Sequence, residues 1–270
     1  MPLDKARIRF RKSGDLRLVS HLDLMRSLER LLRRAALPFR RTEGFHPTPR
    51  LVLAQSLPLG VVGHHEVLEL ELTEEIDPDE VLRRMREQAP PGIEFLSARR
   101  VPVNVTARPR RAVYRVPLAH PPADAGGSPE SGEPPASAGG WGLGLPDRIA
   151  TFLAAAEVWA ERERPRPRAV NIRPYVESLT VADDALVISC WLTQEGSARA
   201  DEIAAAVGVA DPAGIERVDL ELLDEVPPAE AARTPKVEPQ TRPLDRAVAG
   251  PRPAAPHETW GATANGPIVE

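Results

Sequence analysis

The stretch ARIRFRKSGDLRLVSHLDLMRSLERLLRRAAL, residues 6–37, decides the fold because a strand pattern directly precedes the clearest helix pattern of the chain. Apolar and basic residues alternate over residues 6–11, which is the period of a strand. Ser20 and Asp23 then form a capping-box start, with Asp in place of the usual Glu. Leucines at helical spacing follow on one side, and Pro38 ends the helix. We therefore predict a strand followed by an amphipathic helix over residues 20–37.

The segments that follow complete one strand–helix–strand–strand–helix–strand unit, the split βαβ arrangement. Residues 39–43 and 50–57 read as extended, and the two prolines of the segment 44–49 between them predict a stiff loop. Polar and apolar residues alternate over residues 65–73, and a helix at 77–89 and a strand at 93–101 are predicted next.

The same order recurs further along the chain, and a duplication is its simplest explanation. Strands are predicted at 112–118, 170–181, 185–193 and 215–223, and helices at 145–162 and 197–207. The predicted fold is α+β, with two tandem ferredoxin-like (βαββαβ) halves at residues 1–104 and 105–226. The Pro-, Gly-, Ala- and Ser-rich segment at about 120–144 is expected to be a disordered insertion, and the Pro-rich residues 227–270 a disordered tail.

The charge of the chain is unevenly distributed. Net charge is −4, but residues 1–50 hold 13 Lys and Arg against 5 Asp and Glu. Such a segment favours an anionic partner, most often nucleic acid. No apolar run could span a membrane and no secretory signal is recognisable, so we expect a cytoplasmic protein. The single cysteine, Cys190, excludes an intrachain disulfide and is expected to be buried in a strand.

Five short motifs, spread over residues 1 to about 225, carry a family resemblance. They are Ser20-His21-Leu22-Asp23-Leu24, Gly44-Phe45-His46-Pro47, Leu57-Pro58-Leu59-Gly60, Asn171-Ile172-Arg173-Pro174-Tyr175 and Gly196-Ser197-Ala198-Arg199-Ala200-Asp201-Glu202. Together they resemble the bacterial DUF2344 family, also called radical SAM-linked or radical SAM-associated proteins. The chain departs from the family at His46, Thr48 and Ala200, where Asn, His and Pro are usual. Any role of an imidazole at the position of Thr48 is therefore lost or relocated.

The resemblance implies a partner encoded beside, or fused to, a radical SAM enzyme. At the level of the fold, two ferredoxin-like halves also resemble RAMP-type RNA-processing proteins. The chain lacks the three close cysteines that a radical SAM cluster needs, so it is not itself a radical SAM enzyme and we expect no cofactor. Because no metal-site template is present either, a non-catalytic or weakly catalytic role is favoured over an enzyme. The favoured function is an accessory protein that binds structured RNA, tRNA or rRNA, through the basic N-terminal half. A metal-independent endoribonuclease that uses His21 or His46, and a protein-interaction scaffold without RNA contact, are the alternatives.

The predicted phosphate-binding residues are arginines of the first long helix and of the segment after it. They are Arg26, Arg30, Arg33, Arg34, Arg40, Arg41 and Arg50, and the basic first strand, including Arg7 and Arg9, extends the patch. A solvated helix face with a Glu29–Arg33 pair is the plain alternative.

Three smaller groups are further candidates. Loop recognition is assigned to Gly44, Phe45, His46 and Pro47, because a stiff loop loses little entropy on binding, unless Phe45 folds inward. An anion site at a helix start is assigned to Arg173, Gly196, Ser197 and Arg199, unless Ser197 is simply the N-cap of that helix. No metal site is expected, because the spacing fits no standard template for His21, His46, His64 and His65.

Overall fold

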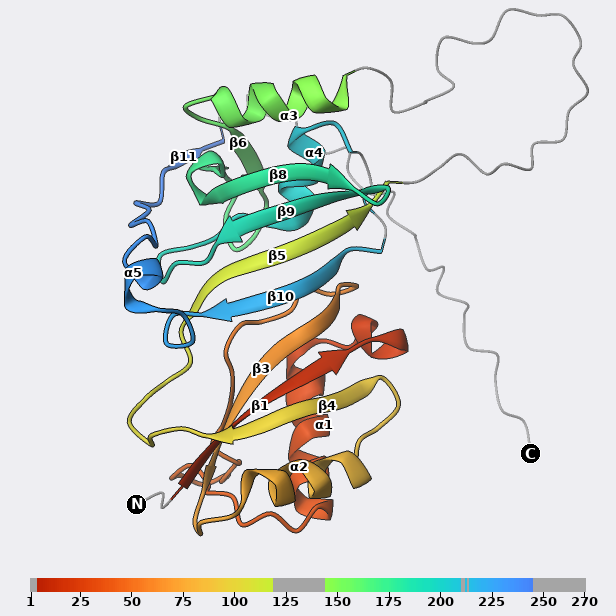
Figure 1. The fold of residues 1–270 in the computed structure, drawn as a ribbon, viewed down its shortest axis with the longest axis vertical. Helices are drawn as coiled ribbons and strands as arrows, with labels where there is room; N and C mark the ends of the chain where they lie inside the picture. Colours follow the sequence, from red (N-terminus) through yellow and green to blue (C-terminus); the bar gives the residue numbers. More distant parts are fainter. Residues whose placement is uncertain (1–3, 119–143, 210–211, 213, 245–270) are drawn as a thin grey trace, which may run out of the picture.

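The computed structural model describes residues 4–118, 144–209, 212 and 214–244. The chain is an α+β protein in which one large sheet runs through both halves, as Figure 1 shows. The predicted α+β class is thereby confirmed. Apart from Gly144, the predicted insertion lies outside the described residues, and so does the predicted tail beyond Leu244. None of the described helices combines the length and the apolar character that crossing a bilayer requires.

The first half follows the predicted order of elements. These are β1 (Asp4–Lys12), the short 3₁₀ helix η1 (Gly14–Leu18), α1 (His21–Arg34), β2 (Leu51–Leu53), β3 (Val62–Leu72), α2 (Pro78–Glu87) and β4 (Ile93–Arg100). The strands pair antiparallel in the order β4-β1-β3-β2. The predicted cap of α1 is confirmed, because the Ser20 hydroxyl oxygen accepts a hydrogen bond of 3.2 Å from the Asp23 N–H.

The second half repeats this strand order. Its elements are β5 (Pro109–Pro117), α3 (Leu145–Ala154), β6 (Trp159–Arg162), β7 (Arg168–Asn171), η2 (Arg173–Tyr175), β8 (Val176–Ala182), β9 (Ala185–Trp191), α4 (Ala200–Ala206) and β10 (Glu216–Leu222). The antiparallel order β10-β5-β9-β8 corresponds to β4-β1-β3-β2 of the first half. The halves meet where β10 runs parallel to β3, with Arg217 opposite Gly63. Strand β3 has 11 residues, so its edge accommodates β10 at one end and β2 at the other.

Each half has its own apolar core. In the first half, α1 contributes Leu24, Leu28 and Leu31 to a cluster with the inward side chains of β1 and β3. The second cluster gathers around β5 and β9 and contains Cys190, which is buried as predicted. Burial raises the pKa of the Cys190 thiol to about 12.

Two predicted elements of the second half are wrong in extent. The helix expected over 145–162 ends at Ala154, because residues 159–162 pair with β7 as strand β6. The strand expected over 170–181 is divided by η2, since Pro174 has no N–H to donate to a sheet. In the first half, the strand expected over 50–57 shrinks to Leu51–Leu53.

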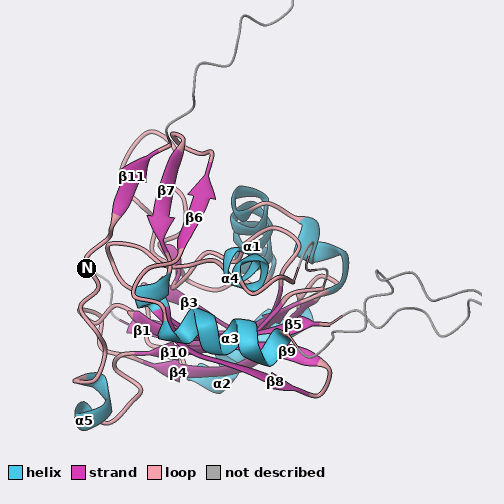
Figure 2. Ribbon diagram, turned by 90° about the horizontal axis from the view of Figure 1, so that it is seen from above, coloured by secondary structure: helices cyan, strands magenta, loops and turns pink. Residues whose placement is uncertain are grey.

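Residues 227–244 correct the predicted tail. They contain α5 (Pro228–Ala231) and β11 (Thr241–Pro243), and β11 pairs with β7. Val237 is 7% exposed and belongs to the second core. The proline content of residues 227–270 predicted disorder, but it gave no sign of the β11–β7 pairing or of the buried Val237. Strands β6, β7 and β11 form a separate sheet that projects from the same side of the large sheet as α1 (Figure 2).

Candidate functional site

A cleft of about 590 Å³ lies between α1 and the chain segment from Thr42 to Val52. Two predicted phosphate-binding arginines, Arg26 and Arg50, and His21 line it. Its volume falls within the range of ordinary ligand pockets. The cleft therefore gathers, from one helix and one loop, several side chains that the sequence analysis proposed independently.

Both apolar and polar groups line this cleft. Leu22, Met25 and Val52 supply apolar surface, and Leu22 is 67% exposed and Val52 52% exposed. The hydroxyl groups of Thr42 and Thr48 lie on the loop side. The site thus offers cationic, hydrogen-bonding and apolar groups at once, together with the carboxylates of Glu29 and Glu71, which suits a ligand that has both a charged and an apolar part.

The loop beside the cleft, residues 42–48, is closed at its base by two hydrogen bonds. The Thr42 N–H donates to the Thr48 carbonyl oxygen at 2.8 Å, and the Thr48 N–H donates to the Thr42 hydroxyl oxygen at 3.1 Å. Phe45 lies at the tip and is 103% exposed, so the inward-folded alternative is wrong. His46 is exposed on the same loop. A closed base and a solvated ring make this loop a preformed contact surface.

The arginines of α1 face solvent, and their ion pairs are local. Arg26 pairs with Asp23 at 3.0 Å and Arg33 with Glu29 at 2.6 Å. Pairs of this exposed kind contribute little and exchange readily for other anions. Hydrogen bonds, first from Ser20 and then from Arg26, lower the pKa of Asp23. Arg30 is exposed one turn after Arg26 and continues the same face.

The remaining predicted arginines are divided among other contacts. Arg34 donates to the Gln88 carbonyl oxygen at 3.0 Å, next to α2. Arg40 lies 3.1 Å from the Glu71 carboxylate, and Arg50 lies 3.9 Å from it. The Arg41 guanidinium lies 5.5 Å from the centre of the Phe39 ring. Of these four, Arg50 reaches the cleft, where Glu71 partly balances its charge.

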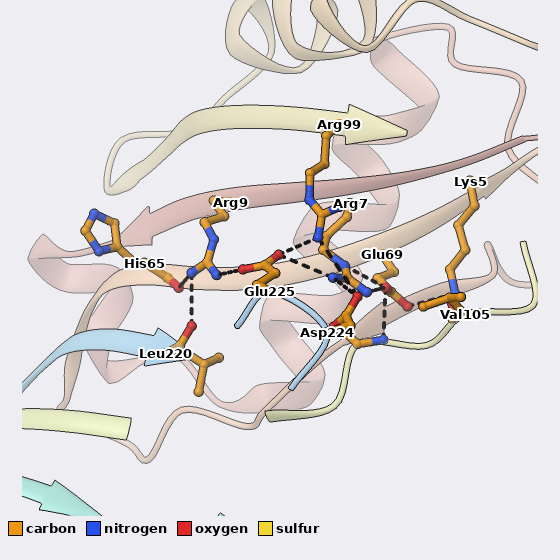
Figure 3. A network of polar contacts seen from close by, with 11 residues as sticks. Lys5, Arg7, Arg9, His65, Glu69, Arg99, Val105, Leu220, Asp224 and Glu225 are labelled. Carbon is orange, nitrogen blue, oxygen red and sulfur yellow. Dashed lines mark hydrogen bonds and ion pairs between the residues drawn. The ribbon is translucent and has the colours of Figure 1, made fainter. Parts of the chain in front are cut away.

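The basic first strand does not extend the patch, which corrects the prediction for Arg7 and Arg9. Figure 3 shows Arg7 enclosed between Glu69 and Asp224, at 2.9 Å and 2.7 Å. Arg9 forms an ion pair with Glu225. Asp224 and Glu225 follow β10 of the second half, so the junction of the halves covers the basic side chains of β1 that were predicted to extend the patch.

This junction perturbs the ionisation of Glu225. Burial raises the pKa of its carboxyl, but ion pairs with Arg99 and Arg9 outweigh burial, so the pKa lies below its ordinary value. Arg99 approaches the Glu225 carboxylate to 2.7 Å. The basic residues of β1 and β4 therefore stabilise the contact between the halves.

The Glu202 carboxylate occupies the helix start at which the sequence analysis predicted a second anion site. Helix α4 begins at Ala200 with Arg199 as its N-cap, so the alternative with Ser197 as N-cap is wrong. Glu202 accepts a hydrogen bond of 3.1 Å from the Arg199 N–H and also binds Arg162 with both oxygens. Arg173 is engaged elsewhere, donating to the Leu153 carbonyl oxygen at 2.8 Å. An added anion would therefore meet a negative charge at this helix start.

The structure does not gather the four histidines named in the sequence analysis. His64 contacts Glu216 at 3.1 Å and His65 contacts Asp219 at 3.6 Å, both on β10. His21 lines the cleft and His46 lies on the loop. Within the described part of the chain, no group of three or more His, Cys, Asp or Glu side chains could hold a metal ion.

Sequence reasoning missed the apolar wall of the cleft and a buried ion pair. Leu22 is the only large apolar residue of α1 that is exposed. Its position outside the stripe of buried leucines on α1 is a sequence signal that could have predicted this exposure. Arg217 of β10 is 1% exposed and pairs with Glu66 of β3. No local pattern announces that pair, because its partners lie far apart in the chain.

Comparison with known proteins assigns the chain to a family. No curated protein matches it. The profile of the family described as "Uncharacterized protein conserved in bacteria (DUF2344)" matches residues 5–203, which include α1, the cleft and most of the second half. On this match, which extends over well more than half of the 270 residues, the chain belongs to the DUF2344 family.

Proposed function

We propose that this protein is a cytoplasmic RNA-binding accessory protein and that RNA contacts the exposed face of α1 and the adjoining cleft. The observation that carries the proposal is the convergence of Arg26, Arg50 and His21 on a cleft with apolar walls. Arginine guanidinium groups suit phosphates, and apolar or aromatic surfaces suit unstacked bases.

The geometry supports recognition of a single strand rather than of a duplex. A cleft of about 590 Å³ has room for one nucleotide unit, with its phosphate toward Arg26 or Arg50 and its base against Leu22 and Val52. Phe45 offers a fully exposed ring beside it, and base stacking on such a ring contributes about 1–3 kcal/mol. Arg30 continues the cationic face along α1, so neighbouring phosphates can be contacted as well.

The finer architecture and the partner are part of the same proposal. The repeated order β4-β1-β3-β2 and β10-β5-β9-β8 supports two ferredoxin-like halves, and through them the likeness to RAMP-type proteins. Partnership with a radical SAM enzyme rests on the family resemblance. In this account the protein presents tRNA or rRNA to that enzyme and performs no chemistry itself.

A protein-docking surface is the second candidate, and one observation favours it. Leu18, Leu22, Val52 and Leu59 are large apolar residues that are each more than half exposed. Apolar exposure of this kind also marks protein contacts. A hydrogen bond from the Gly60 N–H to the Arg17 carbonyl oxygen, 2.8 Å long, brings the turn of Leu59 beside that of Leu18.

Fluorescence anisotropy with single-stranded RNA at several salt concentrations tests the proposal. The variant is Arg26→Glu/Arg30→Glu, and Arg233→Glu/Lys236→Glu is a control with the same charge change on exposed residues that follow α5. Each lost phosphate contact should reduce affinity about fivefold at about 0.1 M salt, so the variant should bind about 25-fold more weakly. The control should bind like the unaltered chain.

The outcomes separate the candidates. Equal binding by variant and control would refute the α1 face as the contact. Absence of RNA binding at low salt, combined with co-purification of a radical SAM protein, would leave only the docking surface. RNA cleavage in EDTA that disappears in His21→Ala would establish the endoribonuclease alternative instead.

A further inference from the structure

A small sheet in the second half carries a basic hairpin that is not part of the RNA-binding surface proposed above. Strands β6 and β7 pair antiparallel, with Arg162 opposite Arg168, and β11 pairs with β7 on the other side. Figure 2 shows this sheet standing away from the large sheet, on the side where α1 lies. The hairpin therefore projects on the side of the large sheet where RNA is proposed to bind α1.

The turn of the hairpin presents two arginines to solvent. It reads Glu163-Arg164-Pro165-Arg166-Pro167, and Arg164 and Arg166 are both exposed. Each proline fixes its own backbone φ angle and restricts the residue before it. The two arginine side chains are thus displayed from a turn with little conformational freedom, which lowers the entropy lost on binding.

A third arginine is oriented by an aromatic ring. The Arg242 guanidinium of β11 lies 4.4 Å from the centre of the Trp159 ring on β6. A stacked guanidinium keeps its N–H edges free for a phosphate while the ring holds its plane. Arg162, by contrast, turns back to Glu202 at 2.6 Å and is not part of this surface.

The chemistry of the hairpin favours a polyanion over an apolar protein segment. Arginines outnumber glutamates along residues 161–168, and the exposed positions there are charged residues and prolines. A two-stranded ribbon with arginines at its turn can follow a phosphate backbone without reading bases.

We infer that the small sheet is a second phosphate-contacting surface, formed by Arg164 and Arg166 of the β6–β7 turn and Arg242 of β11, that binds the backbone of the RNA whose other part lies on α1. This inference rests on the proposed function. Two surfaces on one side of the sheet make binding of a long strand bivalent, because engaging the first raises the effective concentration of RNA at the second.

Anisotropy with a long single-stranded RNA and with a short oligonucleotide tests the inference. Arg164→Glu/Arg166→Glu should weaken binding of the long RNA about 25-fold at about 0.1 M salt and reduce its salt slope by about 1.4, because two contacts are lost. Binding of the short oligonucleotide, which occupies α1 alone, should be unchanged. Both substitutions lie in an exposed turn, and circular dichroism of the variant checks that the fold is kept.

The controls distinguish the inference from the proposal beneath it. Arg233→Glu/Lys236→Glu changes the charge equally and should bind both RNAs normally. If the hairpin variant binds long RNA normally while Arg26→Glu/Arg30→Glu binds it weakly, the inference is wrong and the proposed function stands. If the unaltered chain binds neither RNA at low salt, both are wrong.

Discussion

Glu66→Gln should destabilise the protein strongly, because it leaves the Arg217 guanidinium buried without its counter-charge. Arg217 is 1% exposed and donates to the Glu66 carboxylate through Nε at 2.8 Å and through Nη2. The carbonyl oxygens of Ser56 and Gln55 also accept from it, at 3.3 Å and 3.4 Å, and the Tyr114 side chain is a further hydrogen-bond partner. Gly63 makes room for the pair, since a Cβ there would lie 2.6 Å from the Glu66 side chain.

The magnitude follows from that burial. Removing one partner of a buried pair costs about 3–5 kcal/mol, and the two carbonyl contacts that remain place this case near 3 kcal/mol. For a chain of this size the melting temperature should fall by about 6–12 °C. Differential scanning calorimetry measures the shift. Glu80→Gln, which breaks ion pairs with Arg83 and Arg84 at the surface, is the control and should melt nearly like the unaltered chain.

Removal of the second charge as well should restore part of the lost stability. Glu66→Gln/Arg217→Met removes both charges, so it should melt above the single variant Glu66→Gln. A single variant that melts like the unaltered chain would refute the role of this pair in joining β10 to β3. A double variant that melts far below the single one would show that the arginine contributes through packing rather than through charge.

Three further predictions concern the junction, the cysteine and the C-terminal segment. The pKa of Glu225 is lower in the folded protein than its ordinary value of about 4.3, so the free energy of unfolding should begin to fall as the pH drops below that ordinary value. In Glu225→Gln, acid titration followed by circular dichroism should show a smaller fall. An unchanged acid profile would contradict the assignment. Iodoacetamide at neutral pH should label Cys190 only after unfolding, since burial raises the pKa of the thiol to about 12; rapid labelling of the native protein, detected by mass spectrometry, would show that the thiol is accessible. A chain ending at Val226 should lose at least about 1.5 kcal/mol relative to one ending at Leu244, because Val237 leaves the second core; equal urea midpoints would show that residues 227–244 contribute nothing.

The order of elements could be predicted from the sequence because its signals are local. The leucine spacing and the Ser20 cap specify α1, and the alternation over residues 65–73 specifies β3. Asp183 and Asp184 adopt positive φ angles, 48° and 54°, as expected of the turn that joins β8 to β9. The prediction of helix over residues 155–162 is wrong because an alanine-rich run favours helix locally, whereas the pairing of β6 with β7 decides the structure there.

The candidate site was less predictable for a physical reason. The motifs containing His21 and Phe45 lie in the two segments that border the cleft, but the cleft exists only once α1 packs beside the segment 42–52. Charge counting along the chain treated Arg7 like Arg26. In the folded protein, Arg7 is neutralised by Asp224, more than 200 positions away in sequence, and Arg26 stays exposed. Sequence charge therefore overestimates a basic surface wherever another part of the chain supplies carboxylates.

Ultraviolet crosslinking to single-stranded RNA, followed by mass spectrometry of the crosslinked peptides, tests the central claim most directly. The account predicts crosslinks at Phe45 and within residues 21–30, and their loss in Arg26→Glu/Arg30→Glu. Crosslinks confined to other parts of the chain, or retained in that variant, would contradict the assignment of the α1 face and its cleft to RNA.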